Sequence, residues 1–198
     1  MPERQSFDDI GISQVSSDPF IIFSSKNNSM PIPNTGDYPA YFEKYISLVT
    51  ADSPSEAIAN YSALLLNFFN SLPEEKANYA YATGKWTLKE VLQHMIDTER
   101  IFSYRILRIS RNDTTPLASF DENHYAENAV SSLRSLTNIK EEFIAVRKST
   151  DLLILSFSNE QLSHFGTASN QPVTANAIGF MVFGHLLHHK KIIEEKYL

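Results

Sequence analysis

The chain has 198 residues, of which 42% are hydrophobic and 12% aromatic, a composition typical of globular proteins and not of disordered ones. Its 17 lysines and arginines stand against 23 aspartates and glutamates, so it lacks the basic excess of a general nucleic-acid binder. It has no cysteine, which excludes disulfides, thiolate zinc sites and cysteine nucleophiles, and leaves nitrogen and oxygen as metal ligands.

No run of about 20 apolar residues predicts a membrane span. The N-terminus, MPERQSFDDI, lacks the basic start and apolar run of a signal peptide. We therefore expect a cytoplasmic location, with neither nucleic acid nor membrane as a partner.

Residues 1–37 differ from the rest of the chain. They show no sustained hydrophobic period, and the segment MPIPNTGDYP (residues 30–39) contains three prolines and one glycine, the pattern of an extended arm. We predict an irregular N-terminal extension over residues 1–37, with disorder as one alternative, followed by a single domain over residues 38–198.

The first elements of that domain are helices with clear N-terminal signals. Residues 41–49 suit a short helix. In SPSE (residues 53–56), a serine N-cap, a proline at the first helical position and a glutamate two residues later form a capping box. The helix that follows runs to about residue 72, and TLKE (residues 87–90) opens a second one to about residue 112.

Two further long helices are predicted, from Ser135 to about residue 157 and from Thr174 almost to the C-terminus. Apolar residues recur three and four apart in each long helix. No strand-rich run competes with them, although Pro172 and Val173 suit a strand-like entry to the last helix. Since each apolar stripe must be buried on the others, we predict an all-α fold, a four-helix bundle.

A long connection, residues 113–134, joins the second and third long helices, and connections of this length are often functional. Its residues Phe120, Asp121, Glu122 and Tyr125 either cover a pocket or plug the end of the bundle. We expect His124, on the same connection, and His164 to be exposed loop residues without a chemical role.

Three of the six histidines fall in GHLLHHKKII, residues 184–193. The apolar stripe of the last helix passes through His185 and His189, which lie one turn apart with Cβ atoms about 6 Å from each other. His188 is rotated from His189 by about 100°. Two imidazoles at i and i+4 are well placed to bind one divalent metal ion. The alternative is a pair of core histidines satisfied by hydrogen bonds.

A third histidine, His94, lies on the margin of the apolar face of the second long helix. If that helix runs antiparallel to the last one, His94 comes to a similar height as His185 and His189; otherwise it is an edge residue. Three neutral imidazoles leave a coordination position open, as in catalytic metal sites. Among divalent ions we expect zinc or nickel, with iron or manganese as alternatives.

Three segments together resemble the DinB/YfiT-like superfamily of metal-dependent enzymes. They are GKWTLKEVLQHMIDTER (84–100), FDENHY (120–125) and GHLLHHKKI (184–192). The resemblance spans residues 38–198 and implies a bundle in up-down-down-up order with a metal on His94, His185 and His189, and with His188 as a neighbour. It also implies a small-molecule substrate, a low-molecular-weight thiol as cosubstrate in some members, and a homodimer.

Other polar residues near these segments keep two interpretations each. Asp97, one turn from His94, either orients that ring or a bound water, or forms a surface or interhelix hydrogen bond. Trp86 either covers the mouth of the site or packs as a staple at the helix start. Glu99 is expected to pair with a basic residue. The arginine series 100, 105, 108 and 111 indicates a solvated helix face, or supplies one or two residues that meet an anionic substrate or a partner subunit.

Two function classes follow. The first is a metal-dependent hydrolase or a thiol-dependent S-transferase acting on a small molecule. The second is a non-catalytic metal-binding or stress-related helical module, in which the metal is structural or absent. The sequence leaves open whether the protein is an enzyme.

Overall fold

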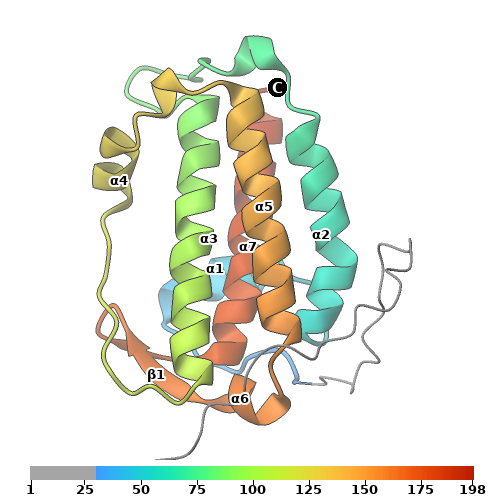
Figure 1. Cartoon of the computed structure of the whole chain (residues 1–198), viewed down its shortest axis with the longest axis vertical. Coiled ribbons are helices and arrows are strands. Elements are labelled where there is room, and N and C mark those ends of the chain that lie inside the picture. The colour runs from blue at the N-terminus through green and yellow to red at the C-terminus, as the bar shows by residue number, and fades with distance from the viewer. Residues whose placement is uncertain (1–29) are drawn as a thin grey trace, which may run out of the picture.

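All four predicted long helices are present in the computed structural model, which describes residues 30–198 (Figure 1). Each begins at a residue whose side-chain oxygen accepts a hydrogen bond from the third residue of the helix, which satisfies a backbone N–H that has no partner within the helix. The helices are α2 (Pro54–Asn70), α3 (Leu88–Ser110), α5 (Leu136–Leu155) and α7 (Ala175–Lys196), and their N-caps are Ser53, Thr87, Ser135 and Thr174.

The bundle has the up-down-down-up order. In Figure 1, α2 and α7 run upward while α3 and α5 run downward. Both α2 and α3 pack against α5 and α7. Because α3 and α5 are parallel, the chain must return along the whole bundle between them, and this explains the long connection. That connection carries a helix that we did not predict, α4 (Glu122–Asn128), and a 3-10 turn, η3 (Ser131–Leu133).

The last helix is the centre of the core. From Ala175 to Leu186 every residue of α7 is buried, as expected of a helix covered on all sides. Besides α2 and α3, the short helix α1 (Glu43–Ile46) packs against α7, and the 3-10 turn η1 (Ala40–Phe42) precedes it. A Cβ atom at Gly184 would lie 2.2 Å from the backbone oxygen of Tyr45, so only glycine permits this approach of α1 to α7.

A β-hairpin precedes α7, where the sequence indicated only a strand-like entry. Strands β1 (Phe165–Ala168) and β2 (Gln171–Thr174) are antiparallel. The two turn residues Ser169 and Asn170 have φ values of 53° and 60°, as in a type I′ turn. Leu117 of the long connection pairs with Ala168. The hairpin and the short α6 (Asn159–Ser163) therefore close the end of the bundle at which α3 and α5 finish (Figure 1).

Residues 30–37 lie against the start of the last helix. The side-chain amide of Asn176 donates to the carbonyl of Pro31 over 2.9 Å. The backbone N–H of Thr174 donates to the carbonyl of Asp37 over 2.9 Å. The rest of the predicted extension, residues 1–29, lies outside the described part of the chain.

Within residues 30–198, no helix combines the length and the hydropathy needed to cross a bilayer. A 3-10 turn, η2 (Glu74–Lys76), completes the elements of this part.

A buried ion pair holds α3 to α5. The Arg147 side chain is fully buried, and its Nη1 lies 3.0 Å from Oε1 of Glu99. Its Nη2 donates to Asp151 over 2.7 Å, and its guanidinium lies over the ring of Phe183 at 4.7 Å. The prediction that Glu99 pairs with a basic residue is confirmed.

Candidate metal centre

The three histidines from two helices meet at one point. Because α3 and α7 are antiparallel, His94 in the second turn of α3 lies beside the middle of α7. Nε2 of His185 is 3.1 Å from Nε2 of His94 and 3.1 Å from Nε2 of His189. One nitrogen from each ring lies within 4.8 Å of the other two. Two nitrogens on a tetrahedral zinc ion are separated by about 3.3 Å, given bonds of about 2.0–2.1 Å.

Hydrogen bonding alone does not account for this cluster. A ring nitrogen of a neutral histidine either donates one proton or accepts one, but not both. Nε2 of His185 therefore forms only one of its two 3.1 Å contacts as a hydrogen bond, and the other brings two nitrogens together without a bond. A cation at the shared point would accept a lone pair from each of the three rings, so the donor set fits a divalent metal ion.

The environment keeps these imidazoles neutral. Burial lowers the pKa of His94 to about 4, against an opposing effect of the Glu122 carboxylate. It lowers the pKa of His189 to about 3 and that of His185 well below its usual range, and the neighbouring histidines add to both shifts. His185 and His189 are only 6% and 9% exposed. Neutral rings have the free lone pairs that metal binding requires.

Aromatic rings enclose the cluster. The ring of Trp86 lies 4.9 Å from that of His94, and Tyr45 and Phe102 lie 5.7 and 6.1 Å from His185. Trp86 also packs against the core, and its carbonyl accepts a hydrogen bond from Tyr197 over 2.6 Å. Both interpretations of Trp86 are therefore compatible with its position. These ring contacts help to hold the imidazoles in their orientations.

The cluster opens into a cavity of about 520 Å³, a size common for small-molecule sites. The cavity is walled by α1, α3, α7, the hairpin and the long connection. From the connection, Phe120 and Glu122 line it, whereas Asp121 caps α4 by accepting from the N–H groups of Asn123 and His124. Tyr125 lines a separate outer hollow. The connection thus covers the pocket through two of its four candidate residues.

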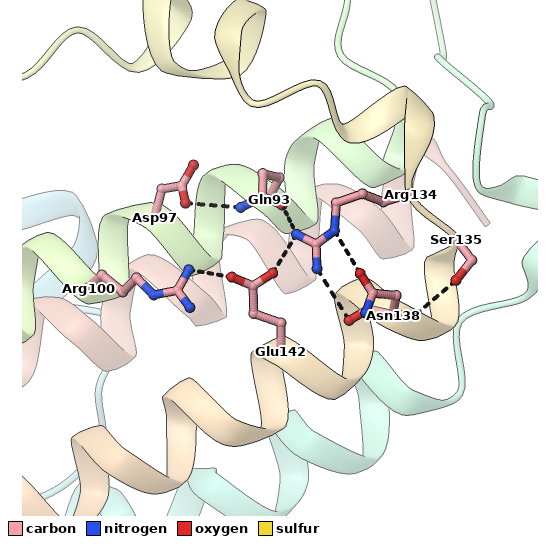
Figure 2. Close-up of polar contacts among 7 residues, drawn as sticks. All are labelled: Gln93, Asp97, Arg100, Arg134, Ser135, Asn138 and Glu142. Carbon is pink, nitrogen blue, oxygen red and sulfur yellow. Dashed lines mark hydrogen bonds and ion pairs between the residues drawn. The ribbon is translucent and has the colours of Figure 1, made fainter.

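Asp97 does not line the histidine cavity. It accepts a hydrogen bond from Gln93 over 3.0 Å, and Gln93 in turn accepts one from Arg134 (Figure 2). Arg134 pairs with Glu142, which also pairs with Arg100. Burial raises the pKa of Asp97, against the effect of the Gln93 hydrogen bond. The hydrogen bond of Asp97 lies within α3, because Gln93 is one turn before it in the same helix. Asp97 thus bonds a neighbouring side chain away from the cavity, and neither orients the ring of His94 nor bonds another helix directly.

The arginine series separates into two environments. Three members have partners at or near the surface: Arg100 with Glu142, Arg108 with Asp113, and Arg111 over the ring of Phe157. The fourth, Arg105, is buried and lines the cavity. The solvated-face prediction is wrong for Arg105, although its spacing of 11 residues from His94, about three turns, was a signal for a shared face.

The remaining histidines take no part in the cluster. His124 is exposed on α4, and His188 contacts Tyr45 across a ring distance of 5.1 Å. His164 is half-buried, with Nδ1 3.2 Å from the carbonyl of Ser110, so it is not the exposed residue that we predicted. Sequence reasoning missed Tyr45 and Ser169, which join the cavity only through the tertiary fold. It also missed Thr98, although its spacing of four residues from His94 was a signal for a shared helix face.

The fold and the site define a helical-bundle protein with an open cluster of three histidines that can hold a divalent metal ion. The model of the DinB superfamily matches residues 59–193, and the chain belongs to that superfamily. Its structure is similar to that of YfiT from Bacillus subtilis, described as a probable metal-dependent hydrolase with an unusual four-helix bundle topology. The identity is 18%, the TM-score is 0.60, and the match covers 83% of this chain and 91% of YfiT. No curated protein matches the chain.

Proposed function

We propose that this protein is a metal-dependent hydrolase that acts on a small molecule bound in the histidine cavity. The observation that carries the proposal is the convergence of three neutral imidazoles on the wall of a cavity of about 520 Å³. The similarity to YfiT, described as a probable metal-dependent hydrolase, supports it. Zinc and nickel suit three imidazole ligands best, with iron and manganese as the alternatives.

His94, His185 and His189 would hold the ion. When bound, a divalent ion supplies Lewis acidity toward a carbonyl or phosphoryl oxygen and lowers the pKa of water. The chain's own contribution is positional, because Tyr45 and Phe102 pack against the ring of His185 and help to hold it in place.

Glu122 is the acidic residue on the cavity wall. It is exposed and begins α4, and its charge acts on His94. We assign it the role of general base, because its carboxylate can accept a proton from a nucleophile that enters the cavity. This carboxylate, and not that of Asp97, faces the histidine cavity.

Metal binding is the first test. Protein purified without a histidine tag is stripped with a chelator and titrated with zinc by calorimetry. We expect one ion per chain, and a loss of affinity in His94→Ala, His185→Ala and His189→Ala that exceeds the about 10- to 100-fold typical of outer-shell changes. His188→Ala is the matched control and should retain zinc. Unchanged affinity in the three variants would contradict the proposed site.

Turnover is the second test. Ester and amide substrates are screened with metal-loaded protein, with and without an added low-molecular-weight thiol. The chain has no cysteine, so a thiol-dependent S-transferase would need that external thiol. Hydrolysis without thiol supports the proposal, strict dependence on thiol supports the transferase, and metal binding without turnover supports a non-catalytic module. Homodimer formation and cytoplasmic location stay predictions from the sequence.

A further inference from the structure

Arg105 is a buried cation on the wall of the cavity. It is 5% exposed, and its Nη2 donates to the carbonyl of Ala118 over 2.7 Å and to Oγ of Ser169 over 3.0 Å. Nε and Nη1 make no hydrogen bond to any residue between 30 and 198, and the ring of Phe120 lies 6.0 Å from the guanidinium carbon, at the limit of a cation–π contact. Ser169 lies in the hairpin turn, where its backbone is left-handed, and it lines the cavity. Two segments distant in sequence thus hold the guanidinium in place.

No carboxylate within the described part of the chain forms an ion pair with Arg105. The other deeply buried arginine, Arg147, has Glu99 at 3.0 Å and Asp151 at 2.7 Å. Glu122 lines the same cavity as Arg105 but forms no ion pair with it. Burial alone shifts the pKa of Arg105, and it lowers it. A buried charge that is not paired is costly, so proteins rarely retain one unless a ligand supplies the partner.

A buried hydroxyl without a hydrogen-bond partner lies between Arg105 and the histidines. Thr98 is 3% exposed and lines the cavity, and its Oγ1 has no hydrogen-bond partner among residues 30–198. His94, Thr98, Phe102 and Arg105 follow one another at spacings of four, four and three residues, so they form a single stripe along α3. From His94 to Arg105 the stripe rises about 16 Å between Cα atoms.

We propose that Arg105 binds a negatively charged oxygen group, a carboxylate or a phosphate, of a substrate whose reacting group lies at the histidine cluster. The hydroxyl of Thr98 forms a hydrogen bond with the part of the substrate that lies between Arg105 and the histidines. The cavity also has several aromatic walls, among them Phe42, Phe102 and Phe120. The substrate is therefore an anion with an apolar part several bonds long between the charged end and the bond that is cleaved. This assignment of a substrate class rests on the proposed function.

The test uses the full chain without metal, because a metal ion would itself bind an anionic probe. Binding of 4-phenylbutanoate and phenyl phosphate is compared with that of the neutral 4-phenylbutanamide by ligand-observed NMR titration. We expect either anion to bind at least about 10-fold more tightly than the amide, as for hydrogen bonds to charged groups. The tighter of the two anions identifies the charged group.

Variants then locate the preference. Arg105→Gln should weaken the anion by roughly 10- to 100-fold and leave the amide unchanged. Arg108→Gln, one turn further along α3 and paired with Asp113 outside the cavity, is the matched control and should change neither. Far-UV circular dichroism checks the fold of each variant. If Arg105→Gln does not fold, Arg105→Lys replaces it, with the anion preference retained and its affinity reduced.

Equal affinity of wild-type protein for the anions and the amide would overturn the proposal, as would a folded Arg105→Gln variant with the wild-type preference. Metal binding is measured separately. Anion preference without zinc binding would support the role of Arg105 and refute the proposed hydrolase. Zinc binding and turnover without anion preference would support the proposed hydrolase and refute the role of Arg105.

Discussion

The contact between α1 and Gly184 predicts opposite outcomes for two glycine substitutions in the same helix. A Cβ atom at Gly184 would lie 2.2 Å from the oxygen and 2.5 Å from the carbonyl carbon of Tyr45. Backbone atoms cannot rotate away, so α1 must move outward by about 1 Å, and such overpacking costs about 1–3 kcal/mol. At Gly179 the nearest atoms, in Pro54, are 3.4 Å from the new Cβ, which is ordinary contact.

Both substitutions gain the same helix propensity, up to about 1 kcal/mol for alanine over glycine. That gain cancels in the comparison, so Gly184→Ala should be less stable than Gly179→Ala by about 1–3 kcal/mol. The assay is urea unfolding of metal-free full-length protein, followed by circular dichroism. In thermal unfolding, each kcal/mol corresponds to about 2–4 °C in Tm for a chain of this size.

A second measurement connects this packing to the metal centre. The ring of Tyr45 lies 5.7 Å from that of His185, so an outward shift of α1 should also weaken zinc binding in Gly184→Ala and not in Gly179→Ala. Equal stability of the two variants, or a more stable Gly184→Ala, would refute the close approach of α1 to α7.

Two more predictions concern buried charge. Arg147→Met leaves the Glu99 carboxylate buried without its 3.0 Å partner and should lower the free energy of unfolding by about 3–5 kcal/mol at pH 7. Because burial raises the pKa of Glu99, this loss of stability should become smaller toward pH 5. Chemical denaturation that gives the same loss at pH 7 and pH 5 would contradict the prediction. In metal-free protein, His94 and His189 have pKa values of about 4 and about 3 when folded, below about 6.5 when unfolded, so the unfolded state takes up more protons. The free energy of unfolding should therefore be highest above about pH 6.5. At lower pH it should fall by up to about 1.4 kcal/mol per pH unit for each histidine. His189→Asn should reduce this slope, and an unchanged slope would show that His189 is not a source of it.

Local signals in the sequence were sufficient for the helices. A capping residue and an apolar period act within one or two turns, so α2, α3, α5 and α7 begin at the predicted residues Ser53, Thr87, Ser135 and Thr174. The pair His185 and His189 follows from helix geometry in the same way, because residues four apart lie on one face. The antiparallel arrangement of α3 and α7 confirms the condition under which His94 joins them.

The elements that the sequence did not reveal are stabilised by distant contacts. The hairpin turn Ser169–Asn170 lacks the glycine that usually marks a type I′ turn, and β1 is supported by Leu117 from the long connection. The helix α4 has only seven residues, too short to be stable through its own propensity. In both cases the tertiary environment decides the conformation.

The four arginines of α3 separate most clearly what the sequence determines from what the fold decides. Their spacing places them on a helix, and this much is local. Whether each one is solvated depends on what packs over it: Arg100 reaches Glu142 at the surface, while Ala118 and the hairpin residue Ser169 cover Arg105. A charge is exposed or buried according to chain segments far away in the sequence. Periodicity therefore predicts which face a residue occupies, but only the assembled bundle determines whether that face meets water, a helix or a cavity.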